Sequence, residues 1–172
     1  MDALEAIFSR KSIKKYKSTP VPKELIDTVI KAGLSAPSGL NKQSPIIIAV
    51  TNKEVRDQLS FINSGCDPFK RNDPFYNAPC VLIVLADKSV PTYLYDGPLV
   101  MENMLICAHA LGLGACWIHR AKETFNGDYG KALLKKLGIE GEYEGIGNCI
   151  LGYPDIDPEK KAVKENRVYY ID

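Results

Sequence analysis

A basic segment near the N-terminus, SRKSIKKYK, holds the residues best suited to chemistry with an anion. Five cations lie in the eight residues from Arg10 to Lys17, with no acidic residue among them. Arg10, Lys11 and Ser12 offer a planar guanidinium, an ammonium and a hydroxyl. This set suits a phosphate dianion, because Arg binds it bidentately and Lys neutralises the remaining charge. If the segment is extended, Lys14 falls on the same side as Ser12. The alternative is a solvated basic turn.

A second cationic pair lies near the other end of the chain. Lys164 and Arg167 belong to a charged tail that becomes apolar and aromatic near its end, at Val168, Tyr169, Tyr170 and Ile171. This tail cannot make a core of its own, so we expect it to wrap a neighbouring surface. A phosphate held from both ends of the chain would explain why the tail exists.

The loop APSGLNKQ, residues 36–43, is the second candidate for ligand binding. Its small residues predict a tight turn, after which Asn41 and Gln43 offer amide donors and acceptors. One hypothesis is a loop whose backbone approaches a flat heteroaromatic ligand while the amides bond its edge. The other is a plain helix-to-strand connection with polar filler. The residues alone leave both open.

Two other patterns fit their apparent chemistry poorly. GLGACW, residues 112–117, lacks the context of a dinucleotide fingerprint, because a helix ends and a strand begins there and Trp117 replaces the third glycine. Cys107 and His109 are two residues apart on a predicted helix and point to different faces, so we expect no metal site with Cys116 and His119. No Ser-His-Asp arrangement supports hydrolysis.

The helices that must position these residues follow from apolar spacing and capping. A short helix capped by Asp2 is expected to end near Arg10, and a second helix to open at Pro22. Helical spacing also predicts a buried helix over residues 94–112 and a short amphipathic helix over residues 130–137. The first helix has one apolar face, made of Leu4, Ile7 and Phe8.

Four apolar runs predict strands, at residues 45–50, 80–86, 114–118 and 146–154. The first two are continuously apolar, which indicates strands covered on both faces. Helices and strands are mixed along the chain. The pattern therefore predicts an α+β sandwich with a small central mixed sheet flanked by helices.

Composition limits the classes of protein that fit. A chain of 172 residues, 45% of them hydrophobic, suits one domain over residues 1–172 with a C-terminal extension over residues 155–172. A net charge of +1 argues against a general binder of nucleic acid or membrane surfaces. We see no membrane span or secretory signal, and the odd number of cysteines indicates reduced thiols in a cytoplasmic protein.

The order of these motifs resembles the FMN-dependent nitroreductase family. The segment SRKSIKKYKSTPVPKELIDTVIKAGLSAPSGLNKQSPIIIAV is similar to the family's opening, R-R/K-S-I/V-R/K, then V-P, then A-P-S-G/A-x-N-x-Q. APCVLIVLA, ENMLICAHALGLGACWI and ILGYP match the later blocks in order, so the resemblance spans nearly the whole chain. It implies a nitroreductase-like sandwich and a homodimer with FMN at the subunit interface. The C-terminal extension would then wrap the partner subunit.

The resemblance also implies a role for each matching residue. The residues that match those holding the FMN phosphate and ribityl chain are Arg10, Lys11 and Ser12. Lys14 matches a cation near the pyrimidine edge of the flavin, where it would contribute electrostatically. The loop that the partner subunit contributes to the same flavin is matched by Pro37, Ser38, Gly39, Asn41 and Gln43. Trp117, Ile118 and His119 fall where the backbone approaches the isoalloxazine. The C-terminal phosphate contacts are matched by Arg167 and Lys164. Residues 64–77 do not align clearly with the family's flavin-edge contacts.

The implied activity is ping-pong hydride transfer from NADH or NADPH through FMN to a nitroaromatic, quinone or similar small acceptor. No side chain is an obvious acid or base, so no catalytic residue is expected and the chemistry belongs to the flavin. The same observation leaves open a non-catalytic protein that stores or senses FMN. Nucleic-acid binding by the basic segment is disfavoured, because aromatic residues do not interleave with the cations.

Overall fold

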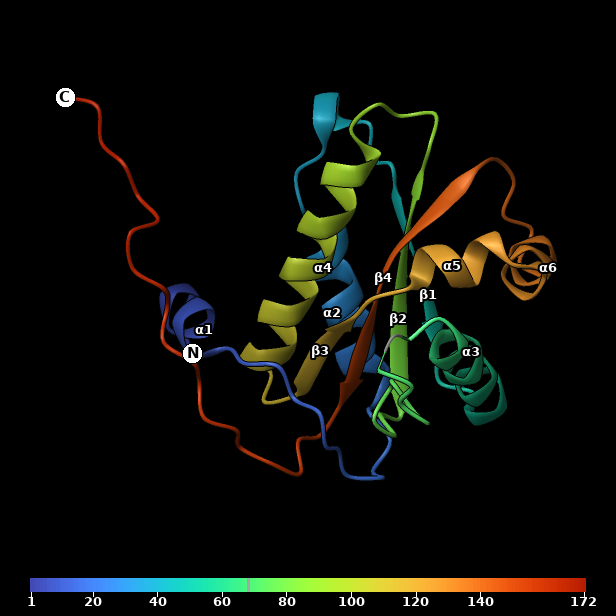
Figure 1. Ribbon diagram of the computed structural model, residues 1–172, viewed down its shortest axis with the longest axis horizontal. Coiled ribbons are helices and arrows are strands. Elements are labelled where there is room, and N and C mark those ends of the chain that lie inside the picture. Colours follow the sequence, from blue (N-terminus) through green and yellow to red (C-terminus); the bar gives the residue numbers. More distant parts are fainter. Residues whose placement is uncertain (68) are drawn as a thin grey trace.

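The computed structural model describes residues 1–67 and 69–172, and a four-stranded sheet forms its centre (Figure 1). The strands are β1 (Pro45–Val50), β2 (Cys80–Asp87), β3 (Gly114–Ile118) and β4 (Tyr143–Gly152), in the order β1-β2-β4-β3. Neighbouring strands pair antiparallel throughout. In the described part of the chain, the only parallel pairing is an isolated bridge between Ser12 and Ala115, at the free edge of β3.

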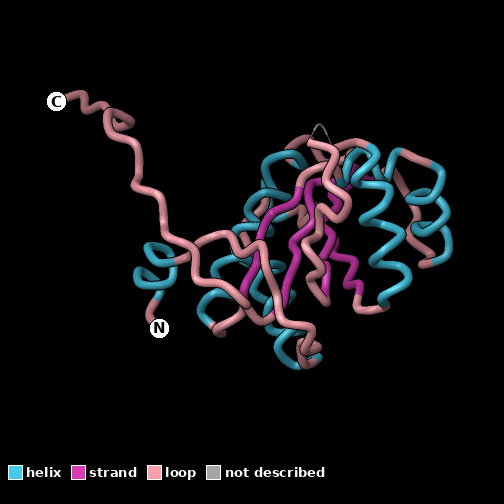
Figure 2. The backbone as a smooth tube through the Cα atoms, turned by 60° about the horizontal axis from the view of Figure 1, so that its bottom comes forward, coloured by secondary structure: helices cyan, strands magenta, loops and turns pink. Residues whose placement is uncertain are grey.

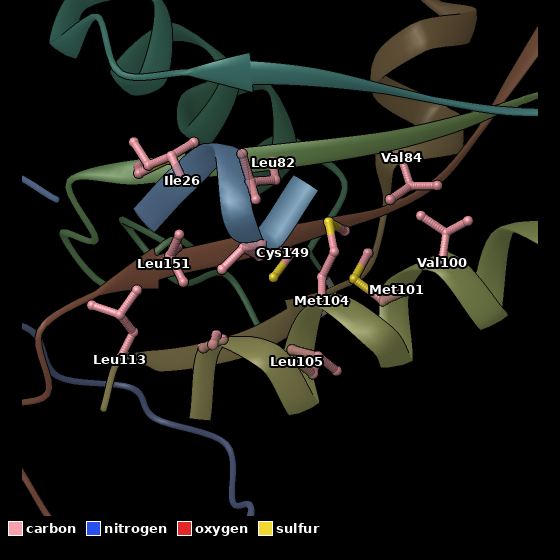
Figure 3. Packing of buried hydrophobic residues seen from close by; sticks show 14 of the residues in the cluster. Ile26, Leu82, Val84, Val100, Met101, Met104, Leu105, Leu113, Cys149 and Leu151 are labelled. Atoms are coloured by element: carbon pink, nitrogen blue, oxygen red, sulfur yellow. The ribbon is translucent and has the colours of Figure 1, made fainter. Parts of the chain in front are cut away.

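Helices cover both faces of the sheet. Helices α2 (Lys23–Leu34) and α4 (Tyr93–Ala110) lie on one face, and α3 (Lys53–Gly65), α5 (Ala121–Asn126) and α6 (Asp128–Lys136) lie on the other (Figure 1). Alternate residues of β2 enter the two cores, which explains its continuous apolar sequence. In Figure 3, Leu82 and Val84 of β2 lie in the same core as Met101 and Met104 of α4. None of the helices in the described ranges is long and apolar enough to cross a bilayer.

The expected α+β class is confirmed, but the predicted mixed sheet is wrong: all its strand pairs are antiparallel, and apolar runs alone do not give the direction of a strand. Strands β1 and β3 have the predicted bounds. Strand β4 begins at Tyr143, three residues before the predicted start. Its pairing with β2 shifts register between Val84 and Leu85, next to Gly145 and Gly147. The register shift interrupts the regular alternation of side chains along β4, so the sequence pattern did not reveal the first residues of this strand.

Both chain ends lie beside the sandwich rather than within it. Helix α1 (Ala3–Ser9) begins as predicted, with Asp2 Oδ1 accepting a hydrogen bond from Glu5 N at 2.8 Å. Its predicted apolar face is exposed in the single chain, as are the apolar residues at the end of the tail. Figures 1 and 2 both show the tail passing α1 and continuing away from the sheet. The two ends therefore present uncovered apolar side chains.

Candidate functional site

The basic segment runs extended beside the edge of the sheet. Ile13 N donates to Ala115 O of β3 at 3.0 Å, and Lys17 N donates to Tyr153 O after β4 at 2.9 Å. Ile13 is buried against the sheet, whereas Ser12 and Lys14 on either side of it are exposed. The alternation places Ser12 and Lys14 on one outward side, as the sequence predicted.

Two half-buried cations lie where the segment leaves α1. Arg10 Nε lies 3.6 Å from Glu102 Oε1, and Lys11 Nζ lies 2.5 Å from Asp157 Oδ1. The carboxylates of these pairs are 50% and 88% exposed, compared with 25% and 24% for the cations. Ion pairs this open to solvent stabilise a protein by about 0–1 kcal/mol. Arg10 and Lys11 can therefore exchange these partners for a more highly charged anion.

The structure adds two residues to this cluster that the sequence did not predict. Lys160 of the tail donates from Nζ to the carbonyl oxygen of Phe8. His109, in the last turn of α4, lies 2.7 Å from Ser9 Oγ through its Nε2. Lys11 and His109 line one cavity of about 560 Å³. Contacts that span 152 and 100 residues leave no local signal in the sequence, so these two residues could not be found from it.

The predicted cations of the tail lie further along the chain. Lys164 and Arg167 are exposed, in the stretch of tail that leaves the body of the molecule (Figure 1). Within the described residues, neither side chain makes an ion pair with a carboxylate. In the single chain, Lys160 is the tail cation that reaches α1.

Lys14 lies beside Tyr76, which belongs to the segment of residues 64–77 that does not align clearly with the family's flavin-edge contacts. Its Nζ lies 5.8 Å from the centroid of the Tyr76 ring. Tyr76 Oη accepts a hydrogen bond from Arg71 Nη1 at 3.0 Å. Arg71 in turn donates to both carboxylate oxygens of Asp67, at 2.6 and 2.8 Å. These hydrogen bonds from Arg71 hold the pKa of Asp67 well below its usual range. An ionised, fixed Asp67 thus keeps an aromatic ring beside Lys14.

The end of β3 offers main-chain groups at the same edge. Backbone groups of a strand point to the same side every second residue, so the N–H and C=O of Trp117 face the free edge as those of Ala115 do. The Trp117 indole lies on the other side of the chain, against Gly147, where an added Cβ would come within 2.5 Å of Nε1. Ile118 is buried. The carbonyl of His119 is occupied, because it accepts from Asn63 Nδ2 at 2.8 Å.

The predicted loop is held in a strained, well-bonded shape. Leu40, Asn41 and Gln43 have φ values of 51°, 53° and 48°, which few non-glycine residues adopt. Ser38 Oγ accepts from Gln43 N at 2.9 Å, and Asn41 Oδ1 accepts from Gln43 Nε2 at 3.1 Å. Pro37 is exposed. The amides of Asn41 and Gln43 remain exposed to solvent, as ligand-binding groups would be.

Asp96 of α4 anchors this loop and was not predicted. Its buried carboxylate accepts from Gly39 N at 3.0 Å, Ser44 Oγ at 2.7 Å and Thr92 Oγ1 at 3.0 Å. Burial alone would raise the pKa of Asp96, but these three hydrogen bonds outweigh burial and lower it. Gly39 is required for this contact, because a Cβ there would lie 2.3 Å from Thr92 Oγ1.

The loop and the basic cluster lie toward opposite ends of α4 (Figure 1). Asp96 holds the loop near the start of α4, and His109 meets the cations in its last turn. At about 1.5 Å per residue, the thirteen positions from 96 to 109 span about 20 Å. One chain alone therefore does not bring the two halves of the predicted site together.

A comparison with protein families identifies the family of the chain. The profile of the nitroreductase family matches residues 7–65 and 63–153 of the chain. The chain belongs to the nitroreductase family. The resemblance expected from the sequence is confirmed.

Relatives and solved structures agree with this membership. An FMN reductase [NAD(P)H] of Bacillus subtilis is 31% identical over 177 residues, covering 93% of this chain and 69% of the relative. A protein of Methanothermobacter thermautotrophicus is 35% identical over 121 residues, which cover 68% of this chain but only 60% of that relative. A crystal structure of a nitroreductase with bound FMN from Bacteroides fragilis superposes with a TM-score of 0.90 at 25% identity, over the full length of both chains. A nitroreductase from Desulfitobacterium hafniense has a TM-score of 0.89 at 22% identity and shows the shared fold.

Proposed function

We propose that this nitroreductase-family chain is an FMN-dependent NAD(P)H oxidoreductase that acts by ping-pong hydride transfer. The acceptor would be a nitroaromatic, a quinone or a similar small molecule. The single observation that carries the proposal is the extended basic segment at the free edge of β3, with paired cations at one end and Lys14 further along. The printed activities of relatives support it, including the FMN reductase of Bacillus subtilis and an NADPH-flavin oxidoreductase of Vibrio harveyi.

The residues present fit FMN. Arg10 and Lys11 are half-buried cations held only by weak, exposed ion pairs, which suits a phosphate dianion. Lys14 lies three residues beyond Lys11 along an extended chain, about 10 Å away, which separates the phosphate contacts from a cation for the ring. The main chain of Trp117 faces the same edge. Lys164 and Arg167 would add phosphate contacts if the tail folds back in the assembled protein.

Bound FMN supplies the hydride chemistry, and the chain supplies binding, orientation and charge. Arg10 and Lys11 anchor the phosphate, with Ser12 as a hydroxyl donor beside them. Lys14 would place a positive charge beside the pyrimidine edge of a bound flavin, where it would stabilise negative charge on the reduced ring. The acceptor and the nicotinamide would occupy the same exposed face in turn, as a ping-pong cycle requires.

We place the site at the interface of a homodimer, with the whole chain 1–172 as one domain. The loop of residues 37–43 is anchored at Asp96 and the basic cluster meets His109, about 20 Å further along α4 of the same chain. A second copy would contribute its loop to the flavin site of the first chain, and the first chain would contribute its own loop to the flavin site of the second. The exposed apolar residues of α1 and of the tail over residues 155–172 would then be covered by the partner subunit.

The proposal is tested by the absorption spectrum of the purified protein with FMN, before and after anaerobic addition of NADH or NADPH. We expect bound FMN to be bleached by at least one nicotinamide and its colour to return when a quinone or nitroaromatic is added. Initial rates should give parallel lines in double-reciprocal plots, which identifies a ping-pong cycle. Protein that binds no FMN would overturn the proposal. Bound FMN that neither nicotinamide reduces would favour storage or sensing instead.

A further inference from the structure

His109 lies among the cations that the proposed function assigns to the FMN phosphate. Its ring is half-buried at the end of α4 and contacts Ser9 of α1. It lines the same cavity of about 560 Å³ as Lys11. The other charged groups on this cavity belong to Lys17, Asp155, Asp157 and the N-terminal residue Met1, which carries the α-amino group. The mechanism described above gives this imidazole no role.

The hydrogen bonds assign the tautomer of the neutral His109 ring. Ser9 Oγ lies 2.6 Å from the carbonyl oxygen of Glu5, which can only accept, so the hydroxyl donates its single proton there. The same hydroxyl oxygen must therefore accept from His109 across the 2.7 Å contact, so Nε2 carries the hydrogen. Nδ1 is then the unprotonated nitrogen, and a second proton would enter there.

The surroundings of the ring oppose that second proton in the flavin-free chain. Partial burial and then the positive charges of Arg10, Lys11 and Lys160 lower the pKa of His109, whereas the carboxylate of Glu5 acts in the opposite direction. Two carboxylates of the tail line the cavity, and both are engaged with lysines: Asp157 with Lys11 and Asp155 with Lys15. The ring is therefore neutral at pH 7.

We propose that His109 is a further residue of the phosphate site, and that its Nδ1 takes up a proton when a phosphate dianion binds among Arg10, Lys11 and Lys160. The inference rests on the proposed function, because it takes the phosphate to be that of FMN. A bound dianion offsets the neighbouring positive charges and adds a negative charge near the ring. An opposite charge within about 4–6 Å favours the charged form of a group by about 1–3 pH units. Riboflavin has the same ring but no phosphate, so it produces no such effect.

The first test follows the pH titration of the imidazoles by NMR in flavin-free, riboflavin-bound and FMN-bound protein. The chain has only two histidines, so His109→Gln identifies the signal of interest by removing it. We expect the midpoint of His109 to lie below about 6.5 without flavin and with riboflavin. With FMN it should rise by about one pH unit or more. Equal midpoints in the riboflavin and FMN states would overturn the inference and leave the proposed function intact.

The second test compares FMN affinity in wild type and His109→Gln, since glutamine keeps an N–H that can reach Ser9. A pKa raised by one unit corresponds to about tenfold in affinity at low pH. The variant should therefore bind FMN up to about tenfold more weakly at pH 6 and nearly equally at pH 8, with riboflavin affinity unchanged at both. Titration of the phosphate itself affects both proteins and cancels in the ratio. A ratio independent of pH contradicts the inference. Failure of both proteins to bind FMN at any pH overturns the proposed function, and the inference with it.

Discussion

Arg10 is half-buried and forms only a weak ion pair, with Glu102. Its substitution should therefore change cofactor binding more than it changes stability. Its guanidinium is 3.6 Å from a half-exposed Glu102, so this ion pair adds little to stability. We expect Arg10→Ala to weaken FMN binding by about 1.5–3 kcal/mol, which is roughly 10- to 150-fold in Kd, because a charge-assisted hydrogen bond is lost. Flavin fluorescence titration measures the change.

Lys15→Ala is the matched control for Arg10→Ala. Lys15 is an exposed cation of the same segment, and its Nζ lies 3.0 Å from Asp155 Oδ2. The control should leave the Kd for FMN nearly unchanged, while the free energy of unfolding should stay similar in both variants. An equal loss of affinity in the two variants would attribute the effect to general charge and contradict a specific phosphate contact.

At the residue scale, the sequence predicted the side-chain placements that depend only on adjacent residues of the chain. The outward placement of Ser12 and Lys14 follows from an extended segment with a buried Ile13 between them. His109 and Lys160 could not be predicted, because each joins the cluster only through the packing of α4 and the course of the tail. Asp96 was missed for the same reason, since its hydrogen-bond partner Gly39 lies 57 residues away.

At the element scale, Asp96 ties the loop of residues 38–44 to α4. Asp96→Ala leaves three donors without their acceptor, and we expect it to lower the free energy of unfolding by about 2–4 kcal/mol at pH 7. The pKa of Asp96 is lowered in the folded state, so its contribution is present above the unfolded value of about 3.9 and is lost as pH falls below it.

The pH dependence supplies the check on Asp96. Urea unfolding gives the free energy of unfolding of wild type and of Asp96→Ala at pH 7 and near pH 3. The difference between the two proteins should be smaller near pH 3, because the wild-type carboxylate becomes protonated there. All other carboxylates are common to both proteins. An equal difference in the free energy of unfolding at both pH values would contradict the lowered pKa of Asp96.

Helix α5 packs directly on β4 at a glycine. A Cβ at Gly145 would lie 2.3 Å from the backbone carbonyl carbon of Ala121, so the helix would have to move. We expect Gly145→Ala to cost at least about 1–3 kcal/mol, the range for an overpacked core. Gly65→Ala is the control, because among the described residues no atom beyond its chain neighbours and its own helix backbone lies within 4 Å of the added methyl, and its φ is not positive. The control should be neutral or stabilising by about 0.4–1 kcal/mol in the same urea experiment.

The sequence predicted α4 and the four strands but missed α3, and the composition of its inner face explains why. Its buried residues are Arg56, Leu59, Ser60 and Asn63, of which only Leu59 is apolar. The polar ones are buried because they are bonded: Arg56 and Ser60 to Asp73, and Asn63 to the His119 carbonyl. Apolar periodicity cannot reveal a helix whose inner face is satisfied by hydrogen bonds formed in the folded chain.

At the scale of the whole molecule, two features of the single chain support the proposed homodimer. The loop of residues 37–43 is bonded to Asp96 and the basic cluster meets His109, and these two positions lie about 20 Å apart along α4. The apolar faces of α1 and of the tail are exposed. A second copy of the chain would account for both observations. It would cover the exposed apolar residues of the termini, and each copy would contribute its loop of residues 37–43 to the flavin site of the other. This arrangement places each flavin between the segment of one subunit and the loop of the other.

Intersubunit complementation tests that arrangement directly. One chain carries Arg10→Ala, a second carries Asn41→Ala with Gln43→Ala, and the two are co-expressed with different tags and purified as a mixed dimer. If the loop acts across the interface, one site of the mixed dimer combines both defects and the other combines two intact halves. Near half of the wild-type number of tight FMN sites should then return, although each variant alone has none. If the loop serves its own chain, every site keeps one defect and no tight site returns. Calorimetric counting of FMN sites separates these outcomes. The substitutions leave the buried core untouched, because Asn41 and Gln43 are exposed and Arg10 is only half-buried.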